Sequence, residues 1–145
     1  MSKILYTAHA TAIGGRNGYA KTDDEVLKLD LSSPGSPNAK PGSTNPEQLF
    51  ACGYAACFGS ALEFVAKENK VTIEDAQVQA DVTLNKDESG FFISVTLNVS
   101  LPGLAKDAAA KLVEAAHQVC PYSKATRGNI EVTLKANDHA LKQAA

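Results

Sequence analysis

The fold is decided by a stretch in the middle of the chain, residues 44–70, which read TNPEQLFACGYAACFGSALEFVAKENK. The stretch opens with a helix start, in which Thr44-Asn45 offers a capping side chain, Pro46 suits the first turn and Glu47 adds an early carboxylate. The first half of the helix that follows is apolar on nearly every side, which is typical of a central helix buried by its neighbours. We therefore predict a long core helix that starts at Pro46 and ends at about Lys70.

The most apolar part of this stretch, residues 49–65, is interrupted by two glycines, a serine and a glutamate. We consider it too short and too polar to span a membrane, and we predict no membrane contact. Residues 1–6 lack the long apolar run of a signal peptide, so a cytoplasmic location is expected. The formal net charge of -2 gives no reason to expect a nucleic-acid partner.

On the amino-terminal side, two segments have the composition of strands, residues 3–10 and residues 25–31. Between them, GGRNG at residues 14–18 is a glycine-rich turn suited to a hairpin. Residues 32–46 hold four prolines and two glycines and are expected to form a long loop. As a linker this loop would leave an amino-terminal piece too small to fold alone, so we predict a single domain over residues 1–145.

On the carboxyl-terminal side, alternation and helical spacing predict further elements. They are strands over residues 78–84 and 93–101 joined by a turn at 87–90, a helix over about 105–119, a strand over 130–134, and a frayed or helical tail over 138–145. The helix would turn Ala108, Leu112, Ala116 and Val119 toward the core, and Pro121 would end it. This order predicts an α+β domain with mainly antiparallel sheet.

The chain carries three cysteines, at positions 52, 57 and 120. In the reducing cytosol we expect reactive thiols or inert core residues rather than structural disulfides. Five helical residues separate Cys52 from Cys57, which turns their side chains about 140° apart, so the two cannot meet. We predict that Cys52 packs as a small hydrophobe.

Two interpretations are open for Cys57, which lies among apolar neighbours. Burial would raise the pKa of the thiol and leave it inert. A nearby cation would instead make it reactive, and Arg16 in the glycine-rich turn is the candidate, because a guanidinium keeps its charge in a buried site.

Cys120 falls at the end of the expected second helix, directly before Pro121. The end of a helix at this point is consistent with a movable thiol that forms a disulfide with another cysteine. It is equally consistent with a cysteine that only fills space at the helix end. His117 and Cys120 could supply two zinc ligands, but no further ligand has supporting spacing, and we predict no metal site.

Three strings, taken in order, resemble the organic hydroperoxide resistance (Ohr) proteins, a branch of the OsmC-like superfamily. They are GGRNG at residues 14–18, TNPEQLFACGYAACF at residues 44–58 and VCPYSKATRGNI at residues 119–130. The resemblance covers essentially the whole chain. Its one departure is Cys52, where alanine is expected in such a helix.

The resemblance implies an OsmC-like fold and an intertwined homodimer with two active sites at the subunit interface. It makes Cys57 the peroxidatic cysteine and Cys120 the resolving one, with Arg16 and Glu47 as an activating pair. It implies no metal and no bound organic cofactor. The implied electron donor is a dihydrolipoyl dithiol on a lipoylated protein, and the implied substrates are alkyl and fatty-acid hydroperoxides.

With those roles, ordinary thiol chemistry describes the reaction. The Cys57 thiolate attacks the distal peroxide oxygen and becomes a sulfenic acid. Cys120 condenses with it to form a disulfide, which a dithiol donor reopens. Nearby aromatic residues are candidates for an apolar substrate site, although such residues are more often plain core: Phe50, Tyr54, Phe58 and Tyr122.

Glu47 poses a geometric problem, because ten helical residues, or about 15 Å of rise, separate it from Cys57. It cannot touch that thiol on a straight helix of one chain. We expect it either to act only on Arg16 or to act on a site built from both subunits. In both cases a bidentate carboxylate would orient the guanidinium and leave donors free for the sulfur.

Three rival functions remain open. They are an OsmC-type peroxidase with a different substrate range, a non-catalytic module that binds an apolar ligand, and a redox sensor that signals through its disulfide. The Cys-Pro-Tyr-Ser string at residues 120–123 favours the Ohr branch over the first. The sequence offers no recognition helix or basic patch for a sensor that binds DNA.

Overall fold

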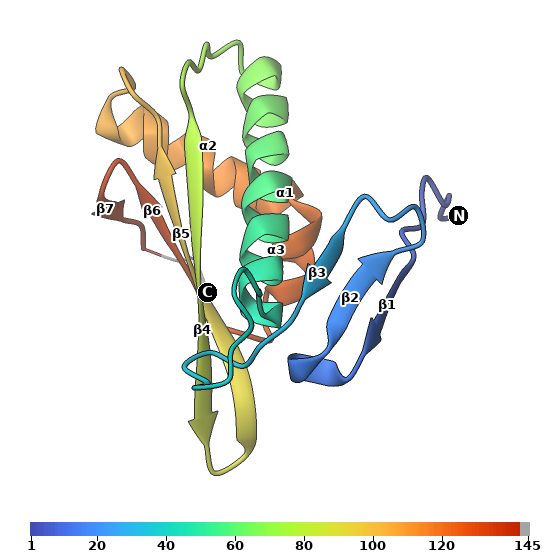
Figure 1. The fold of residues 1–145 in the computed structure, drawn as a ribbon. Helices are drawn as coiled ribbons and strands as arrows, with labels where there is room; N and C mark the ends of the chain where they lie inside the picture. The colour runs from blue at the N-terminus through green and yellow to red at the C-terminus, as the bar shows by residue number, and fades with distance from the viewer. Residues whose placement is uncertain (143–145) are drawn as a thin grey trace. The chain divides into compact units, whose positions relative to one another are not determined.

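A computed structural model describes residues 1–142 and divides into two compact units, one over Met1–Leu49 and one that begins at Phe50. The first unit contains a three-stranded sheet in the order β1-β2-β3. The second contains a four-stranded sheet in the order β4-β5-β6-β7. Figure 1 shows both sheets and the helices.

The first sheet is antiparallel and consists of β1 (Ala10–Ile13), β2 (Tyr19–Thr22) and β3 (Lys28–Asp30). The expected strand over residues 3–10 was wrong, because the strand begins at Ala10 and the residues before it are exposed and irregular. The expected strand over residues 25–31 is confirmed only over β3. The sequence did not reveal β2, whose four residues are all half-buried and so show no alternation.

The turn between β1 and β2 is the glycine-rich turn expected from the sequence, and it forms a short 3-10 helix, η1 (Gly15–Asn17). Gly14 has a φ of +78°, which glycine adopts without steric cost. A Cβ on Gly18 would lie 1.6 Å from the backbone oxygen of Ile13. Only glycine fits there, so these residues dictate the tight hairpin that presents Arg16.

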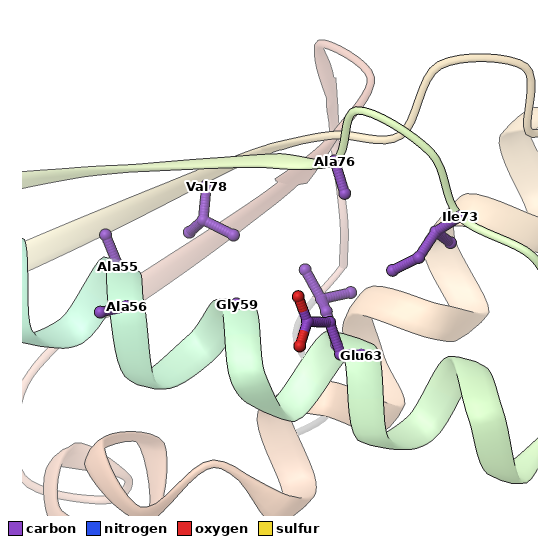
Figure 2. Close-up of a pocket in the computed structure, with 8 residues that line it drawn as sticks. Ala55, Ala56, Gly59, Glu63, Ile73, Ala76 and Val78 are labelled. Carbon is purple, nitrogen blue, oxygen red and sulfur yellow. The ribbon is translucent and has the colours of Figure 1, made fainter.

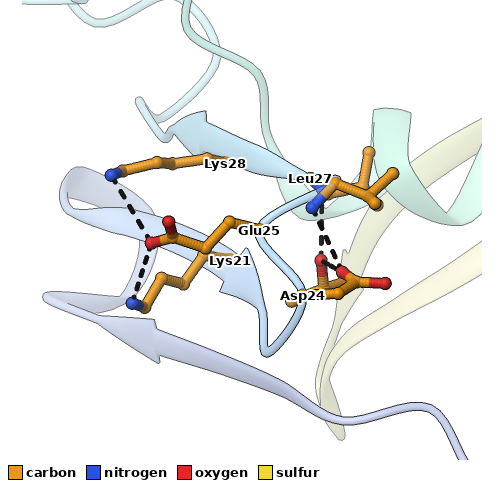
Figure 3. Close-up of polar contacts among 7 residues, drawn as sticks. Lys21, Asp24, Glu25, Leu27 and Lys28 are labelled. Atoms are coloured by element: carbon orange, nitrogen blue, oxygen red, sulfur yellow. Dashed lines mark hydrogen bonds and ion pairs between the residues drawn. The ribbon is translucent and has the colours of Figure 1, made fainter.

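The connection from β2 to β3 is held by local polar contacts (Figure 3). The Lys21 ammonium lies 3.2 Å from the Glu25 carboxylate, and Lys28 lies 3.7 Å from the same oxygen. The Thr22 hydroxyl accepts a hydrogen bond from the backbone N–H of Leu27 at 3.1 Å. These exposed contacts set the turn and contribute little to overall stability.

The proline-rich loop returns the chain to the start of α1 (Pro46–Glu68). Leu31 and Thr44 form an isolated parallel bridge across the loop. The Asn45 side chain accepts the backbone N–H of Gln48 at 2.9 Å, which is an N-cap. The predicted start of the helix at Pro46 is confirmed, and its end lies two residues before the expected one.

The second unit continues with β4 (Gln77–Asp87), β5 (Gly90–Ser100), α2 (Lys106–Val119), α3 (Pro121–Thr126), β6 (Val132–Ala136) and β7 (His139–Ala140). The β4–β5 hairpin and the extent of α2 confirm the predictions. β5 and β6 pair in parallel, and the other neighbours pair antiparallel, so the sheet is mainly antiparallel as expected. The parallel pair was not anticipated, because alternation does not show which strand lies alongside.

Three details of this unit differ from the sequence-based prediction. The core face of α2 is Ala109, Leu112, Val113 and Ala116, whereas the expected Ala108 and Val119 are exposed. Pro121 does end α2, but it also begins α3, since proline is well suited to a first helical turn. The expected frayed or helical tail contains β7 instead, and its residues 143–145 lie outside the described part of the chain.

The core of the second unit is one cluster to which α1, β5, β6 and α2 all contribute. α1 enters it along a single stripe, with Tyr54, Phe58 and Leu62 each no more than 1% exposed. The sequence predicted a helix that is buried on most sides. In the single chain this is confirmed for one face of α1 only. The spacing of the buried residues is that of one helical face.

Among the described residues, α1 is long and apolar enough to cross a membrane when judged by length and composition alone. The expectation that this stretch is too short and too polar was therefore wrong on that criterion. Core helices of soluble proteins pass the same test. The buried stripe of α1 in the core cluster supports that second interpretation.

Candidate active site

Two cysteine sulfurs from distant parts of the sequence meet in the second unit. The thiol of Cys120 donates to the sulfur of Cys57 at 3.6 Å. A disulfide has its sulfurs about 2.05 Å apart, so this is a pair of free thiols in close contact. Because disulfide formation requires only a small approach from here, the two thiols are placed for reversible oxidation to each other.

The surroundings of the two thiols differ. Cys120 is fully buried at the elbow between α2 and α3, with φ -64° and ψ 123°, and its backbone N–H bonds to the Ala116 carbonyl at 2.9 Å. Cys57 is only half-buried on α1. A reagent from solvent can therefore reach Cys57, whereas Cys120 is shielded from solvent.

Burial raises the pKa of the Cys57 thiol. A hydrogen bond from the Tyr122 backbone lowers it, and the contact with Cys120 raises it again. The expected direction of this effect, a pKa raised by burial, is therefore confirmed for the surroundings of Cys57 within the second unit. A positive charge close to the sulfur would act in the opposite direction and favour the reactive thiolate.

The first unit contains an ion pair between the two other residues singled out from the sequence. The two terminal nitrogens of Arg16 donate to the two carboxylate oxygens of Glu47, at 2.7 and 2.6 Å. The two residues that were expected to act as a pair are thus in bidentate contact within one chain. It lowers the pKa of Glu47 and raises the pKa of Arg16, so both groups stay charged over the physiological range.

The aromatic residues proposed as a substrate site divide into two groups. Tyr54 and Phe58 are fully buried in the core, whereas Phe50 is half-buried and Tyr122 is 37% exposed. The rings of Phe50, Tyr54 and Tyr122 form a cluster with centroids 5.6–6.0 Å apart. Only Phe50 and Tyr122 therefore present ring surface that a ligand could reach from solvent.

A chain of hydrogen bonds beside the sulfurs was not found from the sequence. The Tyr54 hydroxyl lies 2.9 Å from the Ser123 hydroxyl, which lies 2.8 Å from Nδ1 of His117. Tyr54 also lies 3.2 Å from the Thr126 hydroxyl. A serine in a short helix gives no sequence signal of burial, although its place in the Cys-Pro-Tyr-Ser string marked the region.

The ring of His117 takes part in this chain of hydrogen bonds. No group of three or more possible ligands that could hold a metal ion occurs among residues 1–142. Burial lowers the pKa of His117, and the charge of Arg127 lowers it further, so the ring is neutral near pH 7.

Comparison with known proteins places this geometry in a family. Residues 37–135 match the model of the OsmC-like protein family. Organic hydroperoxide resistance protein OhrB of Bacillus subtilis is 53% identical over 133 residues, which are 90% of this chain and 97% of that protein. The chain belongs to the OsmC-like family, in its organic hydroperoxide resistance branch.

Further relatives of this OsmC-like protein agree. The organic hydroperoxide resistance protein of Xanthomonas axonopodis pv. citri is 49% identical, covering 91% of this chain and 94% of that one. The crystal structure of Bacillus subtilis OhrB matches with a TM-score of 0.86 at 54% identity, covering 91% and 98% of the two chains. The structure of an organic hydroperoxide resistance protein from Elizabethkingia anophelis matches with a TM-score of 0.84 at 49% identity, covering 92% and 96%. The predicted α+β, OsmC-like fold is confirmed.

The third cysteine of this OsmC-like protein is placed differently from its prediction. Cys52 is exposed on α1 and does not pack as a small hydrophobe. It lies on another side of the helix from Cys57, as the spacing predicted. The apolar neighbours in the sequence were misleading because only one stripe of α1 enters the core.

A cavity of about 230 Å³ lies between α1 and the segment that leads into β4 (Figure 2). Small residues line its α1 side, including Ala55 and Gly59, with Glu63 as the charged group, and Ile73 and Val78 lie opposite. Neither Cys57 nor Cys120 is among its lining residues. The cavity is therefore separate from the thiol pair and is not the place where a substrate would meet the sulfur.

Proposed function

We propose that this OsmC-like protein is a cysteine-based, dithiol-dependent peroxidase that reduces organic hydroperoxides to alcohols. The observation that carries the proposal is the contact of 3.6 Å between the Cys57 and Cys120 sulfurs. Relatives at about half identity that are named for organic hydroperoxide resistance support the substrate class. Alkyl and fatty-acid hydroperoxides are the proposed substrates.

In the proposed first step, the Cys57 thiolate attacks the distal oxygen of the hydroperoxide. The sulfur–oxygen bond forms as the oxygen–oxygen bond breaks, and the leaving alkoxide takes a proton to become an alcohol. Cys57 is left as a sulfenic acid. The half-buried position of Cys57, with Cys120 buried behind it, supports this assignment of the attacking role.

The attacking thiolate needs a cation, because burial raises the pKa of Cys57. We assign this part to Arg16, with Glu47 as the residue that orients its guanidinium. The bidentate contact uses one N–H of each terminal nitrogen and leaves the other donors of the guanidinium free for a sulfur or a peroxide oxygen. Glu47 is then a positioning residue and not the base that deprotonates the thiol.

In the proposed second step, the Cys120 thiol attacks the Cys57 sulfenic acid. The disulfide forms, and the hydroxyl leaves with the thiol proton as water. An external dithiol then reduces the disulfide by exchange and becomes a disulfide itself. We propose a dihydrolipoyl group on a lipoylated protein as this dithiol, on the strength of the sequence resemblance.

The substrate's organic group would lie against exposed aromatic surface. Phe50 and Tyr122 are the proposed contacts, with Tyr54 and Phe58 supporting them from the core. This arrangement would favour an organic hydroperoxide over hydrogen peroxide, which has no apolar group to bury. We further propose a cytoplasmic homodimer that needs no metal and no bound cofactor.

The decisive experiment is steady-state reduction of cumene hydroperoxide with dihydrolipoamide by wild type and three single variants. We expect Cys57→Ser to lose turnover and Cys120→Ser to lose sustained turnover, because each lacks one sulfur of the disulfide. Cys52→Ser is the matched control and should remain near normal, since Cys52 is exposed and outside the pair.

Turnover by Cys57→Ser at the wild-type rate would overturn the proposal. Mass spectrometry of the oxidised wild type should show a link between residues 57 and 120 within one chain. A protein that binds an organic hydroperoxide without reducing it would instead be a non-catalytic binding module.

A further inference from the structure

Three polar side chains from the helices that carry or flank the two cysteines are joined by hydrogen bonds, and we call them the hydroxyl clasp: Tyr54 on α1, Ser123 on α3 and His117 on α2. Their polar atoms are 2.9 Å apart between Tyr54 and Ser123 and 2.8 Å apart between Ser123 and His117. Tyr54 and Ser123 are both 0% exposed. Hydrogen bonds that are buried to this degree are stronger and more directional than those at a surface.

The clasp and the sulfur pair join the same two segments. Tyr54 precedes Cys57 by three residues on α1, and Ser123 follows Cys120 by three residues at the start of α3. Residues three apart on a helix lie on one face, about 4.5 Å apart along the axis. Tyr54 and Cys57 therefore lie one turn apart on one face of α1, and each contacts the segment formed by Cys120 and the start of α3.

The clasp also holds the elbow at which Cys120 lies. His117 on α2 makes two contacts beyond Cys120, since its ring contacts Ser123 in α3 and its carbonyl oxygen accepts a hydrogen bond from Arg127, directly after α3. These contacts join a residue before Cys120 to two residues after it, and so they fix the angle between α2 and α3. The three helices around the buried thiol are joined by one set of contacts.

The protons of the clasp can be placed without leaving any group unpaired. Thr126 can donate to the Ser123 carbonyl, so that Tyr54 donates to Thr126, Ser123 to Tyr54, and His117 to Ser123. In the reverse order Ser123 donates to His117, Tyr54 to Ser123 and Thr126 to Tyr54, which gives up the contact of Thr126 with the Ser123 carbonyl. Among the described residues, no buried side-chain nitrogen or oxygen lacks a partner. A buried network whose contacts are all made, as in the first order, is rigid and favours one geometry.

We propose that the hydroxyl clasp positions Cys120, so that its thiol closes the disulfide with the Cys57 sulfenic acid faster than that acid is oxidised further. The sulfurs must approach from 3.6 Å to about 2.05 Å. A thiol held in register needs only a small movement of the elbow. Ser123, Tyr54 and His117 are positioning residues in this step, which rests on the proposed peroxidase function.

Ser123→Ala tests the inference, because it removes the central hydroxyl and leaves both sulfurs. After one equivalent of cumene hydroperoxide, we expect its disulfide to close roughly three- to tenfold more slowly, the loss that one buried hydrogen bond supports. Dimedone should then trap more Cys57 sulfenic acid, and excess peroxide should give more sulfinic acid by mass spectrometry. The rate of sulfenic acid formation should stay at the wild-type value.

Tyr54→Phe supplies a second, independent variant, since it keeps the ring and removes only the hydroxyl. We expect it also to slow closure of the disulfide. The double variant with Ser123→Ala should be slowed by less than the product of the two single effects, because both substitutions remove the same hydrogen bond between Tyr54 and Ser123. If Ser123→Ala does not fold, Tyr54→Phe carries the test. Val99→Ala, which trims a core side chain in β5, is the control for general destabilisation.

Closure at the wild-type rate in either clasp variant would overturn the inference. Equal slowing in Val99→Ala would overturn it as well, because the effect would then belong to stability and not to position. Wild-type protein that forms neither sulfenic acid nor disulfide would overturn the proposed function and this inference with it. Normal turnover by the wild type together with unslowed clasp variants would overturn the inference alone.

Discussion

At the scale of single residues, the chemistry depends on how charge is distributed between two thiols and one ion pair. Burial raises the pKa of Cys57, which protects the thiol from ionising in the absence of a cation. The Arg16–Glu47 pair has the opposite effect on its acid, because hydrogen bonds from the guanidinium lower the pKa of Glu47. The carboxylate therefore remains charged, and able to orient Arg16, well below neutral pH.

The lowered pKa of Glu47 predicts how the stability of the Glu47→Gln variant, compared with that of wild type, depends on pH. A carboxyl whose pKa is lower in the folded state stabilises the protein above its unfolded pKa of about 4.3, and loses that effect as the pH falls through the folded value. We expect wild type to exceed Glu47→Gln in thermal stability by a constant amount from about pH 5 to pH 8. The difference should shrink below about pH 4, as thermal denaturation at each pH can show.

The same variant should slow the peroxide step at neutral pH by roughly tenfold, since a neutral amide holds the guanidinium less firmly. Glu25→Gln is a suitable control, because Glu25 makes only exposed ion pairs in the same unit. A stability difference between wild type and Glu47→Gln that grew as the pH fell would contradict the assigned ion pair.

At the scale of secondary-structure elements, the sequence predicted those parts whose signal is local. Capping residues located the start of α1, and alternation located β4 and β5, because both patterns depend on neighbours in the chain. β2 was missed because it is half-buried along its whole length. The parallel pairing of β6 with β5 was missed because the alternation within a strand does not show which strand lies beside it in the sheet.

The candidate site divides in the same way. The resemblance named Cys57, Cys120, Arg16 and Glu47, and helix geometry excluded Cys52 as a partner. The hydroxyl of Ser123 could not be found from the sequence, because α3 was not expected and a buried serine is unusual. On α2 the predicted core residues Leu112 and Ala116 are confirmed, whereas Ala109 and Val113 are buried in place of Ala108 and Val119.

The β1–η1–β2 hairpin offers a test of an element that holds a site residue. In Gly18→Ala, the added Cβ would lie 1.6 Å from the Ile13 backbone oxygen, so the hairpin must open. We expect a loss of about 1–3 kcal/mol in stability, as for other overpacked sites, and a slower peroxide step because Arg16 lies in this turn. Urea denaturation and single-turnover oxidation of Cys57 measure the two effects.

Gly59→Ala is the matched control, because its Cβ would meet nothing within 4 Å. Alanine is favoured over glycine inside a helix, so this variant should be more stable by up to about 1 kcal/mol, with an unchanged peroxide step. Equal stability losses in the two variants would mean that steric crowding at Gly18 is not what holds the hairpin.

At the scale of the whole molecule, neither unit has the surface of a complete protein. Leu31 and Ser32 are the only buried residues among residues 1–49, so the first unit has no hydrophobic core of its own. Large apolar side chains are exposed in both units, among them Leu5 at 86%, Phe64 at 57% and Phe91 at 72%. Such surface is unfavourable in water and is usual where another surface covers it.

We therefore predict that the chain unfolds as one domain and does so as a dimer. Because a unit without a core cannot hold its structure alone, thermal unfolding should show a single transition by both calorimetry and circular dichroism. Because a dimer is stabilised by mass action, the midpoint should rise as the protein concentration is raised. Two separate transitions would contradict the single domain, whereas a midpoint independent of concentration, with the mass of one chain in light scattering, would contradict the dimer.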